Sequence, residues 1–328
     1  MRVLVTGGAG YIGSHTTLAL AAAGHEPVVY DNLRQGHRWA VQWGPLVEGD
    51  LRDTARLAAA LREHRIEAVL HFAALIAVGE SVAEPRRYLD NNVAGTLSLL
   101  NAMEQTAVRN VVFSSTAAVY GDPLRLPMDE EHPKAPVSPY GDSKWMAERI
   151  LDWTARTGRI RYAALRYFNA CGGDPEGRTG EVHRPETHLI PLIFESMLDP
   201  HRPLKVFGQD FPTLDGTAVR DYIHVSDLAA AHVAAVEYLA AGGASFAANL
   251  GTGSGFTVRQ VIAAAERITG QRARLVEAPR REGDAAELVA DATRAGQLLG
   301  WRPRHSSLEE ILTTAWRWRT EFGRRHFA

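Results

Sequence analysis

Residues 2–13 have the sequence RVLVTGGAGYIG, which is the strongest indication of the fold. Residues 2–6 are an apolar run of strand length, and the glycine-rich segment GGAGYIG follows at once. Residues 11–23 then have the pattern of a helix, and residues 26–30 that of a second strand with Asp31 after it. A strand, a glycine turn, a helix and an acid after the next strand form the context in which such a turn binds the pyrophosphate of a dinucleotide.

Strands and helices continue to alternate after this unit. Further strands are predicted at residues 66–72, 110–114, 162–168, 204–207, 245–251 and 274–277, and helices at 54–64, 85–105, 138–156, 189–198, 258–269 and 308–322. This order predicts a doubly wound parallel α/β sheet of the Rossmann type. We expect a dinucleotide-binding domain over residues 1–170, with segments near 219–251 returning to it. A smaller substrate-binding domain is expected over residues 171–328.

Composition excludes several other classes of protein. The chain has 328 residues and a formal net charge of −2, so a broad basic surface for nucleic acid is not expected. No stretch is long and apolar enough to suggest a membrane span. The single cysteine, Cys171, cannot form an intrachain disulfide, and no Cys/His spacing suggests a metal site. We expect a cytoplasmic protein without metal.

Two acids are placed to contact the adenosine end of the dinucleotide. Asp31 would accept hydrogen bonds from the ribose hydroxyls and repel a 2′-phosphate, which favours NAD over NADP. Arg34 lies close by and weakens that preference. Asp50 follows the next strand and either reaches the adenine or belongs to a plain turn.

A second pattern carries chemistry. Tyr140 and Lys144 are four residues apart on a predicted helix, so their side chains share a face. A nearby ammonium, a nicotinamide cation and the helix N-terminus would each favour the phenolate of Tyr140, which then serves as a base. Thr116, placed just past the end of a strand, supplies a hydroxyl for the reacting oxygen or only satisfies backbone groups there.

These motifs resemble the extended short-chain dehydrogenases/reductases and, more narrowly, the UDP-glucose 4-epimerase family. The narrower resemblance rests on VGES (78–81), DNNV (90–93), RYFN (166–169), HLIP (188–191), VRDYIHV (219–225) and REGD (281–284). It implies interconversion of UDP-glucose and UDP-galactose through transient oxidation at sugar carbon 4 by bound NAD. It also implies a homodimer built on helices 85–105 and 138–156.

The site residues follow from the motifs and this resemblance. The predicted catalytic residues are Tyr140, Lys144 and Thr116. The residues predicted to contact NAD are Gly7, Gly10, Tyr11, Ile12, Gly13, Asp31, Asn32, Asp50, Leu51, Phe72, Ala73, Ala74, Asn92, Ser114, Tyr140, Lys144 and Tyr167. Those predicted to contact the UDP-sugar are Thr116, Tyr140, Asn169, His188, Leu189, Phe207, Arg220, Tyr222, Arg281, Asp284 and Leu288. Arg220 would instead form an ion pair with Asp221 or another acid if it were only structural.

Two positions depart from the family pattern. Ile76 stands where a lysine is frequent, so one contact to a cofactor phosphate is missing and NAD retention is less certain. Leu288 stands where a tyrosine restricts the pocket to plain hexoses, so N-acetylated sugars are a hypothesis.

Competing functions remain open at this point. A UDP-xylose/UDP-arabinose epimerase would use the same residues. A nucleotide-sugar 4,6-dehydratase or a decarboxylating UDP-xylose synthase needs acidic groups beside Thr116, where this chain has Ala117 and Ala118. A catalytically silent NAD-binding regulator would be expected to lack Tyr140 or Lys144, and this chain has both.

Overall fold

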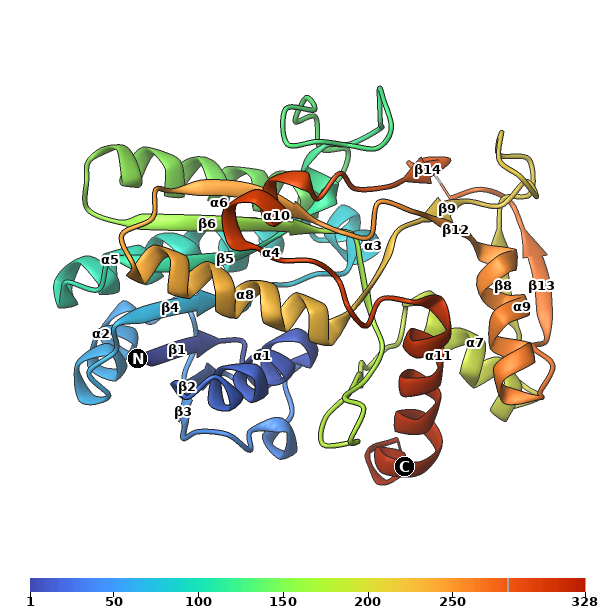
Figure 1. The fold of residues 1–328 in the computed structure, drawn as a ribbon, viewed down its shortest axis with the longest axis horizontal. Helices are drawn as coiled ribbons and strands as arrows, with labels where there is room; N and C mark the ends of the chain where they lie inside the picture. Colours follow the sequence, from blue (N-terminus) through green and yellow to red (C-terminus); the bar gives the residue numbers. More distant parts are fainter. Residues whose placement is uncertain (282, 328) are drawn as a thin grey trace.

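A parallel sheet forms the centre of the computed structural model, which describes residues 1–281 and 283–327 (Figure 1). Within these residues the sheet has seven strands, and every neighbouring pair is parallel. Their order across the sheet is β11 (Phe246–Leu250), β6 (Arg161–Tyr167), β5 (Asn110–Thr116), β4 (Ala68–His71), β1 (Arg2–Thr6), β2 (Glu26–Asp31) and β3 (Leu46–Glu48). The order reverses between β1 and β4, which is where ligands bind in doubly wound sheets. The predicted fold class is confirmed.

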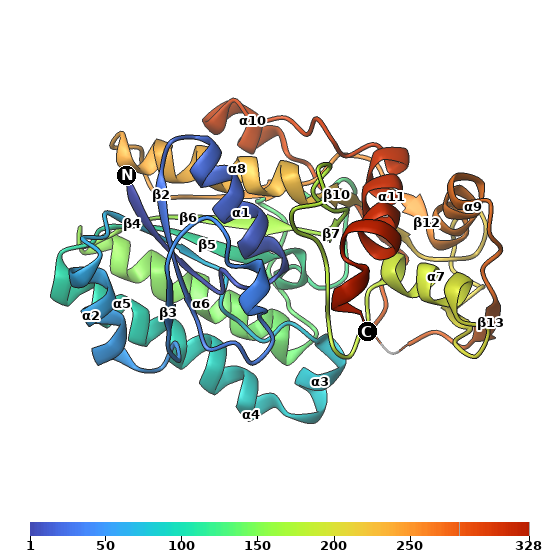
Figure 2. The same cartoon turned by 90° about the horizontal axis from the view of Figure 1, so that it is seen from below.

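Helices cover both faces of this sheet, which explains why its strands are apolar throughout rather than alternating. Figure 2 shows the three layers edge-on. One face carries α1 (Tyr11–Ala22), α8 (Val225–Ala240) and α10 (Thr293–Leu299). The other carries α2 (Thr54–Glu63), α5 (Gly95–Thr106) and α6 (Pro139–Arg156). The strand predicted at residues 245–251 does return to the sheet, as β11 beside β6.

The helix predicted over residues 85–105 is not uniform. It consists of α4 (Pro85–Tyr88), a π-helical segment (Leu89–Ala94) and α5, and a short helix, α3 (Val78–Ala83), precedes it. Hydrophobic periodicity does not predict a π-turn, because its i→i+5 hydrogen bonds depart from the 3.6-residue period of an α-helix. Asn92, in this segment, is buried and makes tertiary contacts.

A second group of elements lies beyond the carboxyl edge of the sheet, at the right of Figure 1. Its helices are α7 (Leu189–Leu198), α9 (Val258–Thr269) and α11 (Leu308–Arg317), which share a hydrophobic core. Its strands are β8 (Leu204–Phe207) with β13 (Leu275–Ala278), and β9 (Val219–Arg220) with β12 (Phe256–Thr257) and β14 (Glu287–Leu288). The helix predicted to end at residue 322 continues after α11 as a π-helical segment (Trp318–Phe322).

Short elements connect the two groups. β7 (Asn169–Cys171) and β10 (Tyr222–His224) form a parallel pair between them. Turns of 3₁₀ helix occur at Arg38–Ala40, Ala117–Val119 and Arg324–His326. Among the described residues, none of the helices combines the length and the apolar character needed to cross a bilayer.

Candidate functional site

The glycine turn between β1 and α1 leaves no room for side chains. Gly7 has a φ of +73°, and a Cβ there would lie 2.6 Å from the backbone nitrogen of Ala73. A Cβ on Gly13 would lie 2.2 Å from the carbonyl oxygen of Gly7. Gly10 precedes the helix without a side-chain cap, so the first N–H groups of α1 stay available to an anion. The turn therefore fits the pyrophosphate of a dinucleotide.

Asp31 ends β2 beside this turn, and its carboxylate is held in place. It accepts hydrogen bonds from the backbone N–H groups of Ala9 (3.1 Å) and Leu33 (2.8 Å). Burial raises the pKa of Asp31, and these hydrogen bonds partly offset the increase. A fixed acid at the end of the second strand matches the position that binds the adenosine ribose.

The neighbouring Asp50 is engaged by protein groups. Arg52 donates to it from Nε (2.8 Å) and Nη2 (3.0 Å), and Asn32 donates from Nδ2 at 3.3 Å. The hydrogen bonds from Arg52 lower the pKa of Asp50. The turn interpretation therefore accounts for this carboxylate, and an adenine contact by Asp50 or the adjacent Leu51 stays a prediction.

The segment after β4 is held against the glycine turn. The backbone N–H groups of Phe72 and Ala73 both donate to the carbonyl of Thr6. Asn92 holds the chain that follows Ala74, because its Oδ1 accepts a hydrogen bond from Leu75 N (2.9 Å) and its Nδ2 donates one to Leu75 O (3.0 Å). The predicted cofactor residues 72–74 are thus brought to the turn, while the amide of Asn92 positions their loop.

Tyr140 and Lys144 lie in the first turns of α6. This helix begins as predicted, with Ser138 accepting a hydrogen bond from Gly141 N (3.2 Å) and Pro139 at the first helical position. The ammonium of Lys144 is buried and donates to the carbonyl oxygen of Ser114 at 2.8 Å. Burial lowers the pKa of Lys144 to about 7, against the opposing effect of the Glu148 carboxylate.

The environment of Tyr140 differs from the one expected. Burial raises the pKa of its phenol, and a hydrogen bond with the Thr116 side chain offsets this only in part. Lys144 does not contribute to that balance, because its ammonium is directed to the backbone of β5. In the protein alone Tyr140 is therefore a weaker acid than free tyrosine. A positively charged ligand beside it would lower this pKa.

Thr116 is the last residue of β5 rather than a residue past its end. It pairs in register with Tyr167 of β6. Its Oγ1 accepts from Ala118 N at 3.1 Å, so it caps the strand end and also bonds Tyr140. The Ser114 hydroxyl bonds the Tyr167 hydroxyl, which places both predicted cofactor contacts side by side. The backbone role of Thr116 is thus seen, and its role toward the reacting oxygen stays a prediction.

A cationic group lies on the second set of elements. Arg281 donates to Asp284 at 2.8 Å, and its guanidinium lies 4.9 Å from the centre of the Phe207 ring. Arg220 approaches the same carboxylate at 3.9 Å. Burial lowers the pKa of Arg220, and Asp284 opposes this effect. Four residues predicted to contact the nucleotide are thus brought together. Glu282 of the same motif lies outside the described residues.

Of the two structural alternatives for Arg220, the pairing with Asp221 is not formed, whereas a pairing with another acid is, since Arg220 lies 3.9 Å from Asp284. The Asp221 carboxylate is occupied by Thr252, Gly253 and the backbone of Ala290. Arg220 is therefore left to face Asp284.

Further substrate candidates lie on the connecting strands and on the second group of elements. Asn169 pairs in register with Tyr222, and its Nδ2 donates to Asp221 O at 3.0 Å. Leu288 pairs with Arg220 and packs against the buried cluster of Ala117, Val119, Tyr120 and Met128, directly after Thr116. Leu288 therefore lies beside the segment that follows Thr116. His188 and Leu189 lie at the start of α7.

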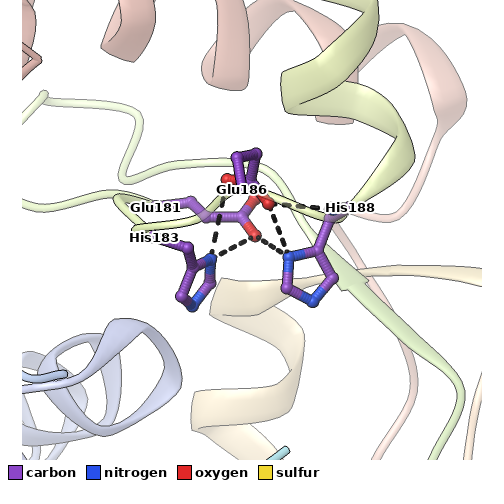
Figure 3. A group of neighbouring side chains, drawn as sticks. All are labelled: Glu181, His183, Glu186 and His188. Atoms are coloured by element: carbon purple, nitrogen blue, oxygen red, sulfur yellow. Dashed lines mark hydrogen bonds and ion pairs between the residues drawn. The ribbon is translucent and has the colours of Figure 1, made fainter. Parts of the chain in front are cut away.

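Sequence reasoning missed two groups of ionisable side chains. Glu148 of α6 and Arg166 of β6 form a buried ion pair, with Nη2 and Oε2 2.5 Å apart. The signal for it was present, because Glu148 lies one helical turn after Lys144. Figure 3 shows the second group, the Glu181–His188 cluster, which consists of Glu181, His183, Glu186 and His188. A search for Cys/His spacing could not find it, because carboxylates complete the set.

The comparisons with known proteins agree with this geometry. Residues 3–251 match the model of the NAD dependent epimerase/dehydratase family. The UDP-glucose 4-epimerase of Rhizobium meliloti is 53% identical over 97% of this chain and 96% of its own length. The crystal structure of UDP-glucose 4-epimerase from Brucella ovis in complex with NAD is 48% identical, with a TM-score of 0.94 over 97% of this chain and 98% of that one. The enzyme of Bifidobacterium longum, in complex with NAD⁺ and UDP, is 38% identical, with a TM-score of 0.92 over 98% of both chains. This chain therefore belongs to the NAD dependent epimerase/dehydratase family, among relatives that are UDP-glucose 4-epimerases.

Proposed function

We propose that this protein is an NAD-dependent epimerase that interconverts UDP-glucose and UDP-galactose. The observation that carries the proposal is the position of Tyr140, Thr116 and Lys144 at the carboxyl edge of the sheet. This edge lies between a turn that fits a dinucleotide and a pair of arginines that fits a diphosphate. Full-length similarity to UDP-glucose 4-epimerases supports the choice of substrate.

The residues for the cofactor are those of the predicted set around the glycine turn. The N–H groups at the start of α1 would bind the pyrophosphate, and Asp31 the adenosine ribose. Ser114, Tyr167 and Lys144 would lie at the nicotinamide end. When bound, NAD⁺ supplies a hydride acceptor that gives the same hydride back, so no external oxidant is consumed.

The residues for the UDP-sugar lie on the second group of elements. Arg220 and Arg281 would bind the diphosphate as bidentate donors. Their ion pairs with Asp284 would then be partly broken. Asp284 would then accept from the uridine ribose, and Phe207 would stack near the uracil. Asn169, His188, Leu189 and Tyr222 would complete the nucleotide site. We divide the chain accordingly, with residues 1–170 and the 219–251 segments for the dinucleotide and 171–328 for the UDP-sugar. Ala328 lies outside the described residues.

The chain performs the proton chemistry. Tyr140, as phenolate, takes the proton of the sugar 4-hydroxyl while carbon 4 loses its hydride and becomes a ketone. Thr116 holds the reacting oxygen and the phenol. The keto sugar turns about its diphosphate link, and Tyr140 returns the proton as carbon 4 regains hydride on its other face. Strong binding of UDP and weak binding of the sugar allow this rotation without release.

The competing activities lack groups that they need. Ala117 and Ala118 follow Thr116 in a 3₁₀ turn, and neither carries a proton-transfer group for dehydration or decarboxylation. A catalytically silent regulator does not require a partly buried Tyr140 hydrogen-bonded to Thr116. Leu288 favours UDP-N-acetylhexosamines as a second substrate, since a leucine beside this segment leaves more space than a tyrosine. UDP-xylose and UDP-arabinose remain a further substrate pair.

The test is incubation of the pure protein with UDP-galactose and no added oxidant, followed by separation of the products. We expect UDP-glucose without net accumulation of NADH. Tyr140→Phe is expected to lower kcat by at least about 100-fold, because general acid–base catalysis contributes 10²–10⁴-fold. NADH formed in proportion to product, or full activity in Tyr140→Phe, would contradict the proposal.

We also propose a homodimer formed through α5 and α6. Leu97 of α5 and Leu89 before it lie about two helical turns apart, as do Met146 and Trp153 of α6. All four side chains are apolar and exposed, Trp153 by 62%. Light scattering should give twice the chain mass, and Trp153→Glu should give monomers. A cytoplasmic location remains part of the proposal, supported by the lone, buried thiol of Cys171.

A further inference from the structure

The loop between β7 and α7 gathers four metal-binding side chains from eight consecutive residues. Glu181, His183, Glu186 and His188 each offer one ligand atom, and these atoms all lie within 4.8 Å of one another. Figure 3 shows both imidazole rings presenting Nδ1 to the two carboxylates. No other group of three or more such residues is found in the described part of the chain.

The distances fit a single ion at the centre. Nδ1 of His183 and Nδ1 of His188 each lie 3.1 Å from Oε1 of Glu181. Glu186 oxygens lie 2.8 Å from His188 Nδ1 and 3.7 Å from His183 Nδ1. Ligands about 2.0–2.1 Å from a tetrahedral Zn²⁺ are separated by edges of about 3.3 Å. The observed distances between ligand atoms lie on both sides of this edge length, so small movements of the four side chains would complete the coordination.

Hydrogen bonding alone does not satisfy this group. Oε1 of Glu181 and Nδ1 of His183 are fully buried, and neither makes a hydrogen bond of normal geometry. The Glu181 side chain is only 8% exposed and is directed into the cluster. The two atoms contact each other as an ion pair at 3.1 Å without forming a hydrogen bond, and a bound cation would satisfy both of them.

We propose that the Glu181–His188 cluster binds one Zn²⁺ per chain. Two imidazole nitrogens and two carboxylate oxygens are ligands that zinc accepts, and four protein ligands describe a closed, structural site rather than a catalytic one. His188 is 43% exposed and provides the route by which the ion enters. The ion would hold the loop against α1, where the His183 ring already meets the Tyr11 ring edge-on at 6.1 Å. The zinc site shares His188 with the proposed nucleotide site, and the metal content of the protein tests it separately from epimerase activity.

The test measures metal directly. The protein, with any purification tag removed, is stripped with a chelator, dialysed against Zn²⁺ and then against metal-free buffer, and analysed by elemental mass spectrometry. We expect about one zinc per wild-type chain, and a Tm that rises with added Zn²⁺. Cobalt loading should give the intense visible bands of a tetrahedral site.

Variants distinguish zinc bound by the Glu181–His188 cluster from zinc bound by other histidines. His183→Gln and Glu186→Gln should each weaken zinc binding by more than about 100-fold, since losing even an outer partner of a ligand costs 10–100-fold. The matched control is His25→Gln, which removes an isolated His–Glu pair (3.0 Å to Glu237) and should keep one zinc. Circular dichroism and NAD binding check that each variant folds. A wild-type protein that retains no zinc, or variants that retain it fully, would overturn the proposal whether or not epimerase activity is found.

Discussion

Removing the charge of Glu148 is expected to destabilise the protein and to lower the pKa of Lys144. Glu148 and Arg166 each have side chains 4% exposed, and Arg166 donates to the carboxylate from Nε (2.9 Å) and Nη2 (2.5 Å). Ser115 donates to the same carboxylate, and Tyr120 accepts from Nη1 of Arg166 at 3.0 Å. Glu148→Gln keeps the shape but leaves the guanidinium without its counter-charge.

The expected loss is about 3–5 kcal/mol in the free energy of unfolding, because an unpaired buried charge costs that much. Urea unfolding at fixed protein concentration measures it, with circular dichroism and tryptophan fluorescence as two probes of one transition. Glu148→Gln also removes the group that raises the pKa of Lys144, so this pKa should fall below about 7.

A control and a double-mutant cycle test the reasoning. Asp152→Asn breaks an exposed pair with Arg156 on the same helix and should cost less than about 1 kcal/mol. Arg166→Met combined with Glu148→Gln should cost clearly less than the sum of the two single changes, since neither charge is then left alone. Strict additivity, or a loss for Glu148→Gln no larger than for Asp152→Asn, would refute the argument.

Three further changes test the cofactor site. Gly13→Ala places a Cβ 2.2 Å from the Gly7 carbonyl, so NAD affinity measured by calorimetry should fall about 10- to 100-fold, and unchanged affinity would contradict the crowding. Asp31→Asn should lower NAD affinity about 10- to 100-fold and NADP affinity less, because a hydrogen bond to a charged group is worth about 1.5–3 kcal/mol; equal losses for both cofactors would argue against its role. Burial lowers the pKa of Lys144 to about 7, so between pH 7 and 10.5 the unfolded chain binds the extra proton. Stability of the cofactor-free protein should therefore rise with pH across this window, by at most about 1.4 kcal/mol per pH unit, and fall as pH drops to 7. Urea unfolding of Lys144→Met should lack this slope, and an identical slope in both proteins would rule out Lys144 as its source.

Local signals in the sequence were enough for the first unit and for the catalytic helix. The apolar run of β1, the crowded glycine turn and the start of α1 are consecutive, so the nearest neighbours along the chain specify them. Ser138 and Pro139 likewise predicted where α6 begins, and with it that Tyr140 and Lys144 share a face. Periodicity also predicted the parallel sheet, because strands buried on both faces are apolar throughout.

The tertiary structure decided which charges meet. The ammonium of Lys144 donates to the backbone of β5 rather than to Tyr140. The four-residue spacing places the two side chains on one face, but the buried ammonium needs a hydrogen-bond acceptor, and β5 supplies it. Arg220 faces Asp284 instead of the adjacent Asp221, because Thr252 and Gly253 occupy the Asp221 carboxylate and a distant loop supplies the partner.

The Glu181–His188 cluster shows the same limit within a single loop. Its four side chains are close in sequence, yet no periodic pattern predicts which way each one points, because the path of a loop depends on contacts with the elements around it. The sequence by itself therefore determined the elements, their order and the cofactor turn, all of which depend on local interactions. Only the folded chain determined the pairing of ionisable groups, because that depends on long-range packing and on the cost of burying a charge without a partner.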